Sequence, residues 1–304
     1  MDVIVTQNLT KDYNGKLAVN NVNMHIPEGS IYGFVGENGS GKTTIMRLIT
    51  GLARPTAGEF TIFGVSSQDK EIYKTREQIA AIVEATSMVP TMSAMDNLTY
   101  QCLYLGLNLS EQDKLDLLRK VHLDHVAYRK KVKNFSLGMK QRLGIAMALM
   151  NKPKLMLLDE PMNGLDPEGI AELRDLLIDL NQKEGLTVLI SSHILSELEK
   201  IASHYGFISH GRLLEETTAV ELNQKCRKII DLKVDNIDKA VIAIQSLHIS
   251  DYKTSPNGEI KIFSDVNITQ LVIALSEQNV EIISFNTIEG SVEDYYLNIS
   301  RRSL

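Results

Sequence analysis

The segment GENGSGKTT, residues 36–44, has the residue types and the spacing needed to hold a phosphate group. It matches the pattern G-x-x-x-x-G-K-T with Gly36, Gly41, Lys42 and Thr43 in register, after an apolar run and before a helical pattern. Glycines let the backbone curl so that several N–H groups converge on phosphate oxygens, and the helix N-terminus adds about half a positive charge. Lys42 would neutralise the β- and γ-phosphates, while the Thr43 hydroxyl would bind Mg²⁺. The other candidate contacts of this loop are Asn38, Gly39, Ser40 and Thr44.

Two carboxylates follow a second apolar run, LMLLDE, which ends at Asp159 and Glu160. Asp159 would hold the Mg²⁺ shell, directly or through water, and Glu160 would accept a proton from an attacking water or orient it. The alternative is that Glu160 is only a surface carboxylate at a strand end. Together with the glycine loop, the two carboxylates specify a P-loop NTPase, and they leave open what the hydrolysis drives.

Two further side chains are candidates on weaker grounds. His193 follows the apolar run LTVLISS, and a neutral imidazole there could donate a hydrogen bond to a γ-phosphate. A single histidine is more often structural. Tyr13 precedes the glycine loop and could stack on an adenine ring, although an aromatic residue at this position is also compatible with simple packing.

A second anion-binding device lies in NFSLGMKQR, residues 134–142. Ser136 and Gly138 stand at the start of a helical pattern, where free backbone N–H groups suit an anion. The glycine loop already provides one phosphate site in the same chain, so the residues alone do not explain why a second one is present.

Short apolar runs that alternate with helical patterns predict the element that positions these residues. The runs 31–35, 154–160 and 186–193 read as buried strands with polar residues at their carboxyl ends. Continuous apolar strands between helices predict a parallel α/β sheet, in which ligands bind at the carboxyl ends of the strands. We therefore expect the three polar endings to share one crevice. Residues 87–150 are more helical and read as a helical insert.

The composition changes after residues 211–216, GRLLEE. From residue 228 onwards the pattern reads strand, helix, strand, strand, helix, strand, which is a ferredoxin-like α+β arrangement, followed by a last helix in SVEDYYLNI. The predicted domains are a nucleotide-binding domain over residues 1–217 and a small accessory domain over residues 218–304.

Composition limits the class of protein. The chain has 304 residues and a net charge of −6, which disfavours a general nucleic-acid-binding surface. Cys102 and Cys226 stand far apart without CxxC spacing, so we read them as reduced thiols. The N-terminus lacks the basic and apolar regions of a signal peptide, and no run reaches the roughly 18 apolar residues of a membrane span. Any membrane role is therefore expected to come through a partner.

The motifs together resemble the nucleotide-binding subunit of an ABC transporter over residues 3–216. Tyr13, GENGSGKTT, FSLGM in place of the usual LSGGQ, LMLLDEPMNGLDP and SSHILSE occur in the order of that family. The resemblance implies an ABC ATPase that binds ATP and Mg²⁺ and forms a homodimer with two sandwiched ATP molecules. It also implies that Ser136 and Gly138 close over the γ-phosphate bound by the second subunit, that Asp166 belongs to the D-loop and that His193 is the switch histidine.

The finer resemblance is to ATP-binding subunits of the bacitracin-resistance type, near those of lantibiotic immunity exporters. The segments IYGFVGENGSGKTT, FSLGMKQRLGIA, NGLDPEGI, SSHILSELE and SVEDYY carry it. Such subunits pair with separate ABC-2-type permeases, which implies a peripheral location on the cytoplasmic face of the membrane. The implied substrate is bacitracin, a lantibiotic or another amphipathic peptide.

One position departs from the family pattern. The family carries glutamine in the Q-loop, at the end of a strand, whereas this chain has Glu84 in AAIVEATSMVP. A glutamate keeps a ligand for Mg²⁺ but lacks the amide N–H donor. The alternative is that Glu84 only ends a strand.

Three other functions compete with peptide export. A regulatory or sensor ATPase would use residues 218–304 to bind a ligand, and an exporter could carry a non-peptide drug or a lipid-like substrate. Soluble ABC proteins that act on the ribosome carry two cassettes in one chain, and those that act on DNA carry a long coiled-coil insert. The single cassette and the lack of heptads in this sequence disfavour both of these soluble types.

Overall fold

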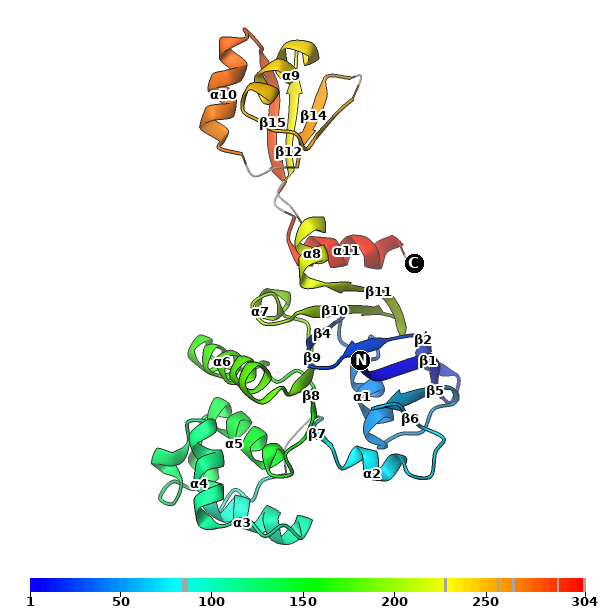
Figure 1. The fold of residues 1–304 in the computed structure, drawn as a ribbon, viewed down its shortest axis with the longest axis vertical. Helices are drawn as coiled ribbons and strands as arrows, with labels where there is room; N and C mark the ends of the chain where they lie inside the picture. The colour runs from blue at the N-terminus through cyan, green and yellow to red at the C-terminus, as the bar shows by residue number, and fades with distance from the viewer. Residues whose placement is uncertain (84–86, 227–228, 256, 264–265, 289, 303–304) are drawn as a thin grey trace. The chain divides into compact units, whose positions relative to one another are not determined.

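The computed structural model describes residues 1–83, 87–226, 229–255, 257–263, 266–288 and 290–302. The chain divides into two compact units, Met1–Ala219 and Val220–Leu304 (Figure 1). The first unit carries all the candidate site residues.

A six-stranded sheet of order β11-β10-β4-β9-β8-β7 forms the centre of the first unit. Its neighbouring strands are parallel except for β10 and β11. All five residues of β4 and all six of β9 are buried, which accounts for their continuous apolar runs. The predicted parallel α/β sheet is thus confirmed. The bounds are β4 (Ile31–Val35), β7 (Ile79–Ile82), β8 (Leu155–Leu158), β9 (Thr187–Ser192), β10 (His204–Ser209) and β11 (Arg212–Thr218).

A second, antiparallel sheet is built from the first 66 residues, and the sequence interpretation missed it. A tight turn at Asn14 and Gly15, with φ of 53° and 90°, joins β1 to β2. Two consecutive residues with positive φ are typical of a two-residue hairpin turn, and Asn-Gly is its strongest sequence signal. The strands are β1 (Asp2–Tyr13), β2 (Lys16–Val22), β3 (His25–Pro27), β5 (Ala57–Ile62) and β6 (Val65–Ser66).

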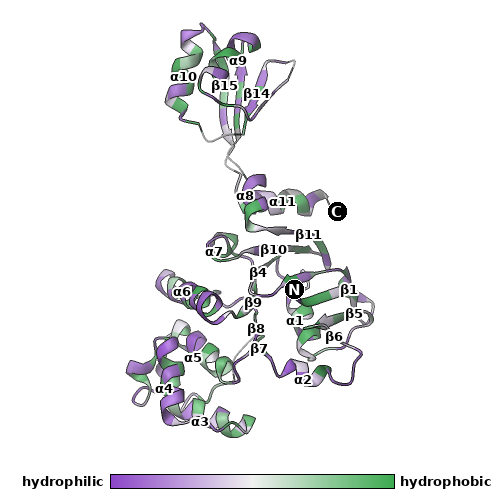
Figure 2. Ribbon diagram, in the orientation of Figure 1, coloured by the Kyte–Doolittle hydropathy of each residue, from purple (hydrophilic) through white to green (hydrophobic). Residues whose placement is uncertain are grey.

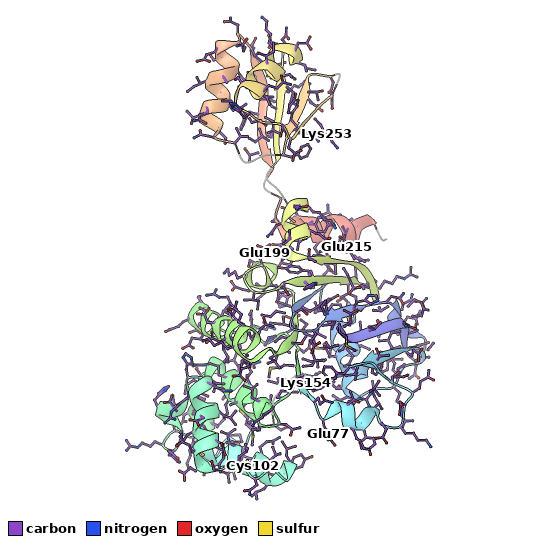
Figure 3. All side chains as sticks on the ribbon, in the orientation of Figure 1. Glu77, Cys102, Lys154, Glu199, Glu215 and Lys253 are labelled. Carbon is purple, nitrogen blue, oxygen red and sulfur yellow. The ribbon has the colours of Figure 1, made fainter. Side chains whose placement is uncertain are left out.

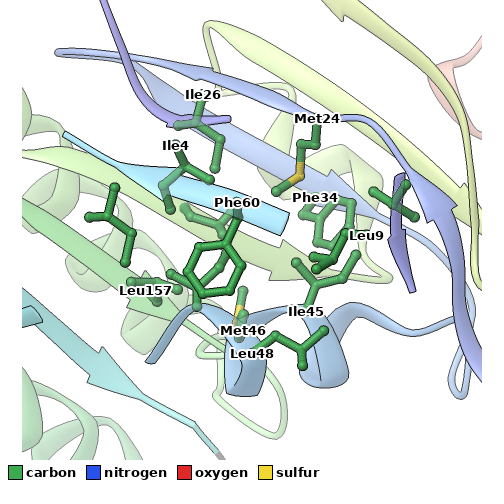
Figure 4. Packing of buried hydrophobic residues seen from close by; sticks show 14 of the residues in the cluster. Ile4, Leu9, Met24, Ile26, Phe34, Ile45, Met46, Leu48, Phe60 and Leu157 are labelled. Atoms are coloured by element: carbon green, nitrogen blue, oxygen red, sulfur yellow. The ribbon is translucent and has the colours of Figure 1, made fainter. Parts of the chain in front are cut away.

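The main core joins this antiparallel sheet to the central sheet and to α1 (Lys42–Thr50). Figure 4 shows Phe34 of β4, Phe60 of β5 and Ile45 of α1 in one cluster, each no more than 1% exposed. Burial of each such side chain stabilises the fold by roughly 1.5–3 kcal/mol. The helix that carries Lys42 and Thr43 is therefore anchored on two sheets.

Residues 87–150 contain three α-helices and two short 3-10 helices, and the described structure of this segment has no strand of either sheet. Ser93 and Ser110 start the first two helices with capping boxes, and Ser136 caps the third. Cys102 lies within this helical part (Figure 3). The other α-helices of the first unit are α2 (Ile72–Arg76), α3 (Ala94–Leu105), α4 (Glu111–Lys120), α5 (Leu137–Leu149), α6 (Pro167–Glu184) and α7 (Leu195–Leu198).

The second unit contains an antiparallel sheet of order β13-β14-β12-β15. Its elements are β12 (Ile229–Val234), α9 (Ile237–Ser246), β13 (Tyr252–Thr254), β14 (Glu259–Ile262), α10 (Ile268–Glu277) and β15 (Ile282–Ile288). Apolar residues alternate with polar ones along both helices, as Figure 2 shows, and the buried ones form a core with the sheet. The unit also includes α8, which begins at the boundary (Ala219–Lys225), and α11 (Val292–Arg302).

Two features outside the site bear on the sequence predictions, namely the cysteines and the lengths of the apolar helices. Cys102 and Cys226 are both free thiols. Among the described residues, no helix is both long enough and apolar enough to cross a membrane.

Candidate active site

The glycine loop connects the carboxyl end of β4 to the start of α1, as the sequence predicts. Gly39 and Gly41 have φ of 82° and 113°, which L side chains rarely adopt. At Gly36 a side chain has no room, because a Cβ atom would lie 2.5 Å from the carbonyl oxygen of Ile208. The loop therefore needs glycine at each of these positions.

Lys42 lies inside this loop and is only 5% exposed. Its Nζ donates to the carbonyl oxygens of Gly36 and Glu37 at 2.5 and 3.2 Å, and it lies 3.2 Å from Oε1 of Glu160. A buried ammonium group held by carbonyls and one carboxylate is prepared to bind an anion that enters the loop.

A cavity of about 280 Å³ opens over the glycine loop. Tyr13, at the end of β1, lines it together with Glu160, and Tyr13 is 43% exposed. The structure thus brings the predicted aromatic residue to the predicted phosphate site. The remaining lining residues are Lys16, Leu17, Ala18, Asn38, Gly39, Ser40, Gly41, Lys42, Thr43 and Thr44.

Asp159 follows β8 and faces Thr43 at the start of α1. The Thr43 hydroxyl donates to Oδ2 of Asp159 at 2.6 Å, and the Ser191 hydroxyl donates to Oδ1 at 2.6 Å. A hydroxyl beside a carboxylate is a donor set that suits Mg²⁺, since Mg²⁺ keeps several waters and substrate phosphates in addition to one or two protein oxygens. Thr43 and Asp159 therefore fit the predicted cation.

Glu160 has a backbone conformation that is rare for a residue with a side chain. Its φ is 49°, in the left-handed region, and its N–H donates to the Ser191 hydroxyl at 2.8 Å. Its Oε2 lies 2.7 Å from Nδ1 of His193 and accepts the His193 backbone N–H at 3.3 Å. The strands β8 and β9 are parallel neighbours, so their carboxyl ends bring these two side chains together.

Ser136, Gly138 and Asp166 lie at the starts of two other helices. The Ser136 side chain accepts from the N–H of Met139 at 3.2 Å, and Asp166 accepts from the N–H of Gly169 at 3.1 Å. A Cβ atom on Gly138 would lie 3.7 Å from the Cα of Gly169, so the two helix starts are adjacent. None of the three lines the cavity over the glycine loop in the described part of the chain.

Glu84, the predicted Q-loop residue, lies outside the described residues. The strand before it, β7, ends at Ile82, which pairs with Leu158 immediately before Asp159.

Sequence reasoning missed two contributions to the site. One is Ser191, for which the only signal was a polar residue at the buried end of β9. The other is the set Lys16, Leu17 and Ala18, which the β1–β2 hairpin brings to the cavity and which the Asn14-Gly15 turn could have indicated.

Comparisons with known proteins agree with this geometry. The family model "ABC transporter" matches residues 19–163. The bacitracin transport ATP-binding protein BcrA of Bacillus licheniformis is 38% identical over 98% of this chain and 97% of its own length. This chain belongs to the ABC transporter family.

Other members of the ABC transporter family match parts of the chain. The lantibiotic transport ATP-binding protein SrtF of Streptococcus pyogenes is 47% identical over 69% of this chain and 88% of its own length. The dimeric structure of the ATP-binding cassette MJ0796 in a post-hydrolysis state, bound to ADP and phosphate, has a TM-score of 0.63 and 27% identity over 71% of this chain and 98% of that one. The resemblance to the bacitracin and lantibiotic group is confirmed. The chain is an ABC ATPase, of a family whose members hydrolyse ATP to drive transport.

Proposed function

We propose that this ABC ATPase powers the export of an antimicrobial or other amphipathic peptide through a separate ABC-2-type permease. The observation that carries the proposal is the match to BcrA, which spans 98% of this chain and so includes the C-terminal unit as well as the cassette. The match to SrtF spans only 69% of the chain, which favours a bacitracin-type system over a lantibiotic one.

Within the site, the contacts support a specific division of roles. Glu160 is the general base, and Lys42 neutralises the β- and γ-phosphates once they replace Glu160 as its partner. His193 donates to the γ-phosphate, and Tyr13 stacks on the adenine ring. When bound, Mg²⁺ neutralises the developing phosphate charge, and Thr43, Asp159 and Glu84 are the residues that would hold it.

A second copy of the chain completes each site. In the described structure of this chain, the cavity over the glycine loop is lined by β1, β2, the loop, α1 and Glu160. Ser136, Gly138 and Asp166 lie at helix starts and are not among these lining residues, so we assign them to the ATP bound by the partner. The dimer of MJ0796 supports this arrangement.

The permease binds the helical part of the cassette in this proposal. Tyr100, Leu103 and Tyr104 of α3 are 51%, 78% and 78% exposed, and neighbouring large apolar side chains on a surface mark an interaction site. With its permease, the chain lies peripherally on the cytoplasmic face of the membrane. No nucleic-acid partner is proposed, because the net charge is −6.

The test is to co-purify the full chain with its permease in lipid and to measure ATP hydrolysis in the presence of bacitracin, a lantibiotic and a non-peptide drug. We expect a peptide to stimulate hydrolysis and bacitracin to be the strongest stimulator. Stimulation by the non-peptide drug alone would contradict the peptide assignment, and failure of the chain to co-purify with the permease would contradict the proposed partner.

A further inference from the structure

Ser191 is a fully buried residue, 0% exposed, near the carboxyl end of β9. Its hydroxyl donates to Oδ1 of Asp159 at 2.6 Å and accepts the backbone N–H of Glu160 at 2.8 Å. A side chain from one strand thus joins two consecutive residues that follow the neighbouring strand.

The chemistry of the two partners fixes the direction of both hydrogen bonds. A carboxylate only accepts and a backbone N–H only donates, so the Ser191 proton must point to Asp159 and a lone pair must face Glu160. Asp159 also accepts from Thr43 through its other oxygen. One chain of hydrogen bonds therefore links Thr43, Asp159, Ser191 and the peptide group of Glu160.

The Glu160 peptide group is the strained member of this chain. Its φ of 49° aims the Glu160 side chain at His193 and Lys42, at 2.7 and 3.2 Å. A non-glycine residue keeps such a conformation only when its surroundings hold it there. The Ser191 hydroxyl is the acceptor that the Glu160 N–H has in this conformation.

We propose that Ser191 is a positioning residue for ATP hydrolysis, which fixes the Asp159 carboxylate and the Glu160 peptide group relative to each other. The proposal rests on the assignment of Glu160 as the base. Ser191 does not line the cavity, so it acts through these two residues rather than on the nucleotide. The neighbouring Ser192 does not share this role, because its hydroxyl bonds to the backbone of Ile194.

Removal of the Ser191 hydroxyl should lower the turnover of ATP and leave ATP binding nearly unchanged. In Ser191→Ala the Glu160 peptide group loses its acceptor and Asp159 loses one of its two donors, so both carboxylates move from their working positions. Small misplacements of reacting groups lower rates by about 10²-fold. We therefore expect kcat to fall about 10- to 100-fold, while the Kd of a fluorescent ATP analogue changes by less than about threefold, because the glycine loop and Tyr13 remain intact.

Thr187→Val is the matched control. Thr187 lies at the opposite end of the same strand, is 1% exposed, and its hydroxyl also accepts a backbone N–H, that of Gly29, at 2.9 Å. A purely structural role for Ser191 predicts equal losses of thermal stability and of turnover in the two variants. The positioning role predicts a loss of turnover in Ser191→Ala that Thr187→Val does not share.

The experiment measures kcat, analogue Kd and melting temperature for the full chain and for Ser191→Ala, Thr187→Val, Ser191→Thr and Ser191→Val. The last two have the same shape and differ in the hydroxyl, so we expect the threonine variant to turn over at least about tenfold faster. Turnover of Ser191→Ala within twofold of the original chain, or equal turnover of the threonine and valine variants, would overturn the proposal. Glu160→Gln is measured in parallel, since normal turnover there would refute the base assignment and not the Ser191 measurement.

Discussion

Nδ1 of His193 lies 2.7 Å from Oε2 of Glu160, and the two residues follow neighbouring parallel strands. The contact occupies one ring nitrogen with a carboxylate, which fixes the orientation of the imidazole. A carboxylate only accepts hydrogen bonds, so Nδ1 carries the proton in this contact and a neutral ring has no second N–H for a γ-phosphate. Donation to the γ-phosphate by a neutral His193 therefore requires that the ring leave Glu160. The proposed base and the proposed switch histidine are thus in direct contact, and a change in either should affect the other.

Glu160→Gln should lower turnover by about 10²–10⁴-fold, because an amide keeps the size of the side chain but cannot accept the proton. ATP binding should remain, and the stalled ATP-bound chain should form a dimer that light scattering detects. Glu77→Gln, at an exposed position, is the control and should hydrolyse ATP normally. Near-normal ATPase activity of Glu160→Gln would refute the assignment.

Ser136→Arg should leave ATP binding by the monomer intact and abolish the ATP-dependent dimer, because Ser136 lies outside the cavity of its own chain. The variant also removes a helix cap worth about 1 kcal/mol. Ser110→Arg removes an equivalent cap at α4 and should still dimerise. Mixing Ser136→Arg with Lys42→Ala should restore one complete site at most, and loss of ATP binding by the Ser136→Arg monomer would contradict the two-chain site.

Glu84→Gln should weaken the apparent Mg²⁺ affinity while Mg²⁺-saturated turnover stays similar or rises. A carboxylate favours the cation, but it also repels the negative charge that develops on the phosphate. Glu84→Ala should lower both the affinity and the turnover. ATPase activity measured against Mg²⁺ concentration for the three proteins tests this, and superimposable curves would remove Glu84 from the metal site.

Truncation after Ala219 should leave a cassette that melts cooperatively and binds ATP. The first compact unit ends at this residue, and β11 reaches Thr218, which pairs with His204. A cut after Glu216 would remove the end of this strand and should lower the melting temperature. Calorimetry and a fluorescence titration of ATP test both forms, and a non-cooperative melt of the longer one would contradict the two-domain prediction.

Tyr32 should make the fold sensitive to alkaline pH. Its phenol is 1% exposed and donates to Oε1 of Glu216 at 2.8 Å. Burial first, and then the Glu216 charge and hydrogen bond, raise the pKa of Tyr32 well above its usual value of 10.0. In the unfolded chain Tyr32 loses its proton near pH 10 whereas the folded chain keeps it, so the free energy of unfolding should fall as the pH rises above 10.

Urea unfolding from pH 8.5 to 11 measures this dependence. Tyr32→Phe should cost about 1 kcal/mol at the lower pH, where the hydrogen bond is lost, and should lose stability less steeply above pH 10. Tyr73→Phe, which removes an exposed phenol, should keep the original slope. Parallel slopes for Tyr32→Phe and the original chain would show that Tyr32 titrates at the same pH in both states.

Local patterns predicted the parts of the fold that are decided by neighbours in the chain. The stretch IYGFV coincides with β4, and the run that stops before Gly51 coincides with α1. A buried strand needs a continuous apolar run, and a helix that follows glycines and ends at one needs no distant contact to be recognised. The antiparallel sheet was missed because β1 pairs with the distant strand β5, with partners from Ile4 and Ile62 to Thr10 and Ala57. Only the Asn14-Gly15 turn signals the sheet locally.

By itself, the sequence determined which residue types the candidate active site contains: the glycine loop, Asp159, Glu160 and His193 follow strand-like runs in an order that predicts a nucleotide site. The tertiary structure decided which of them touch. The register of β8 against β9 places Glu160 beside His193, and it places Ser191 between Asp159 and Glu160. Spacing along the chain fixes neither contact, because strand pairing brings together residues more than 30 positions apart through hydrogen bonds that no local pattern encodes.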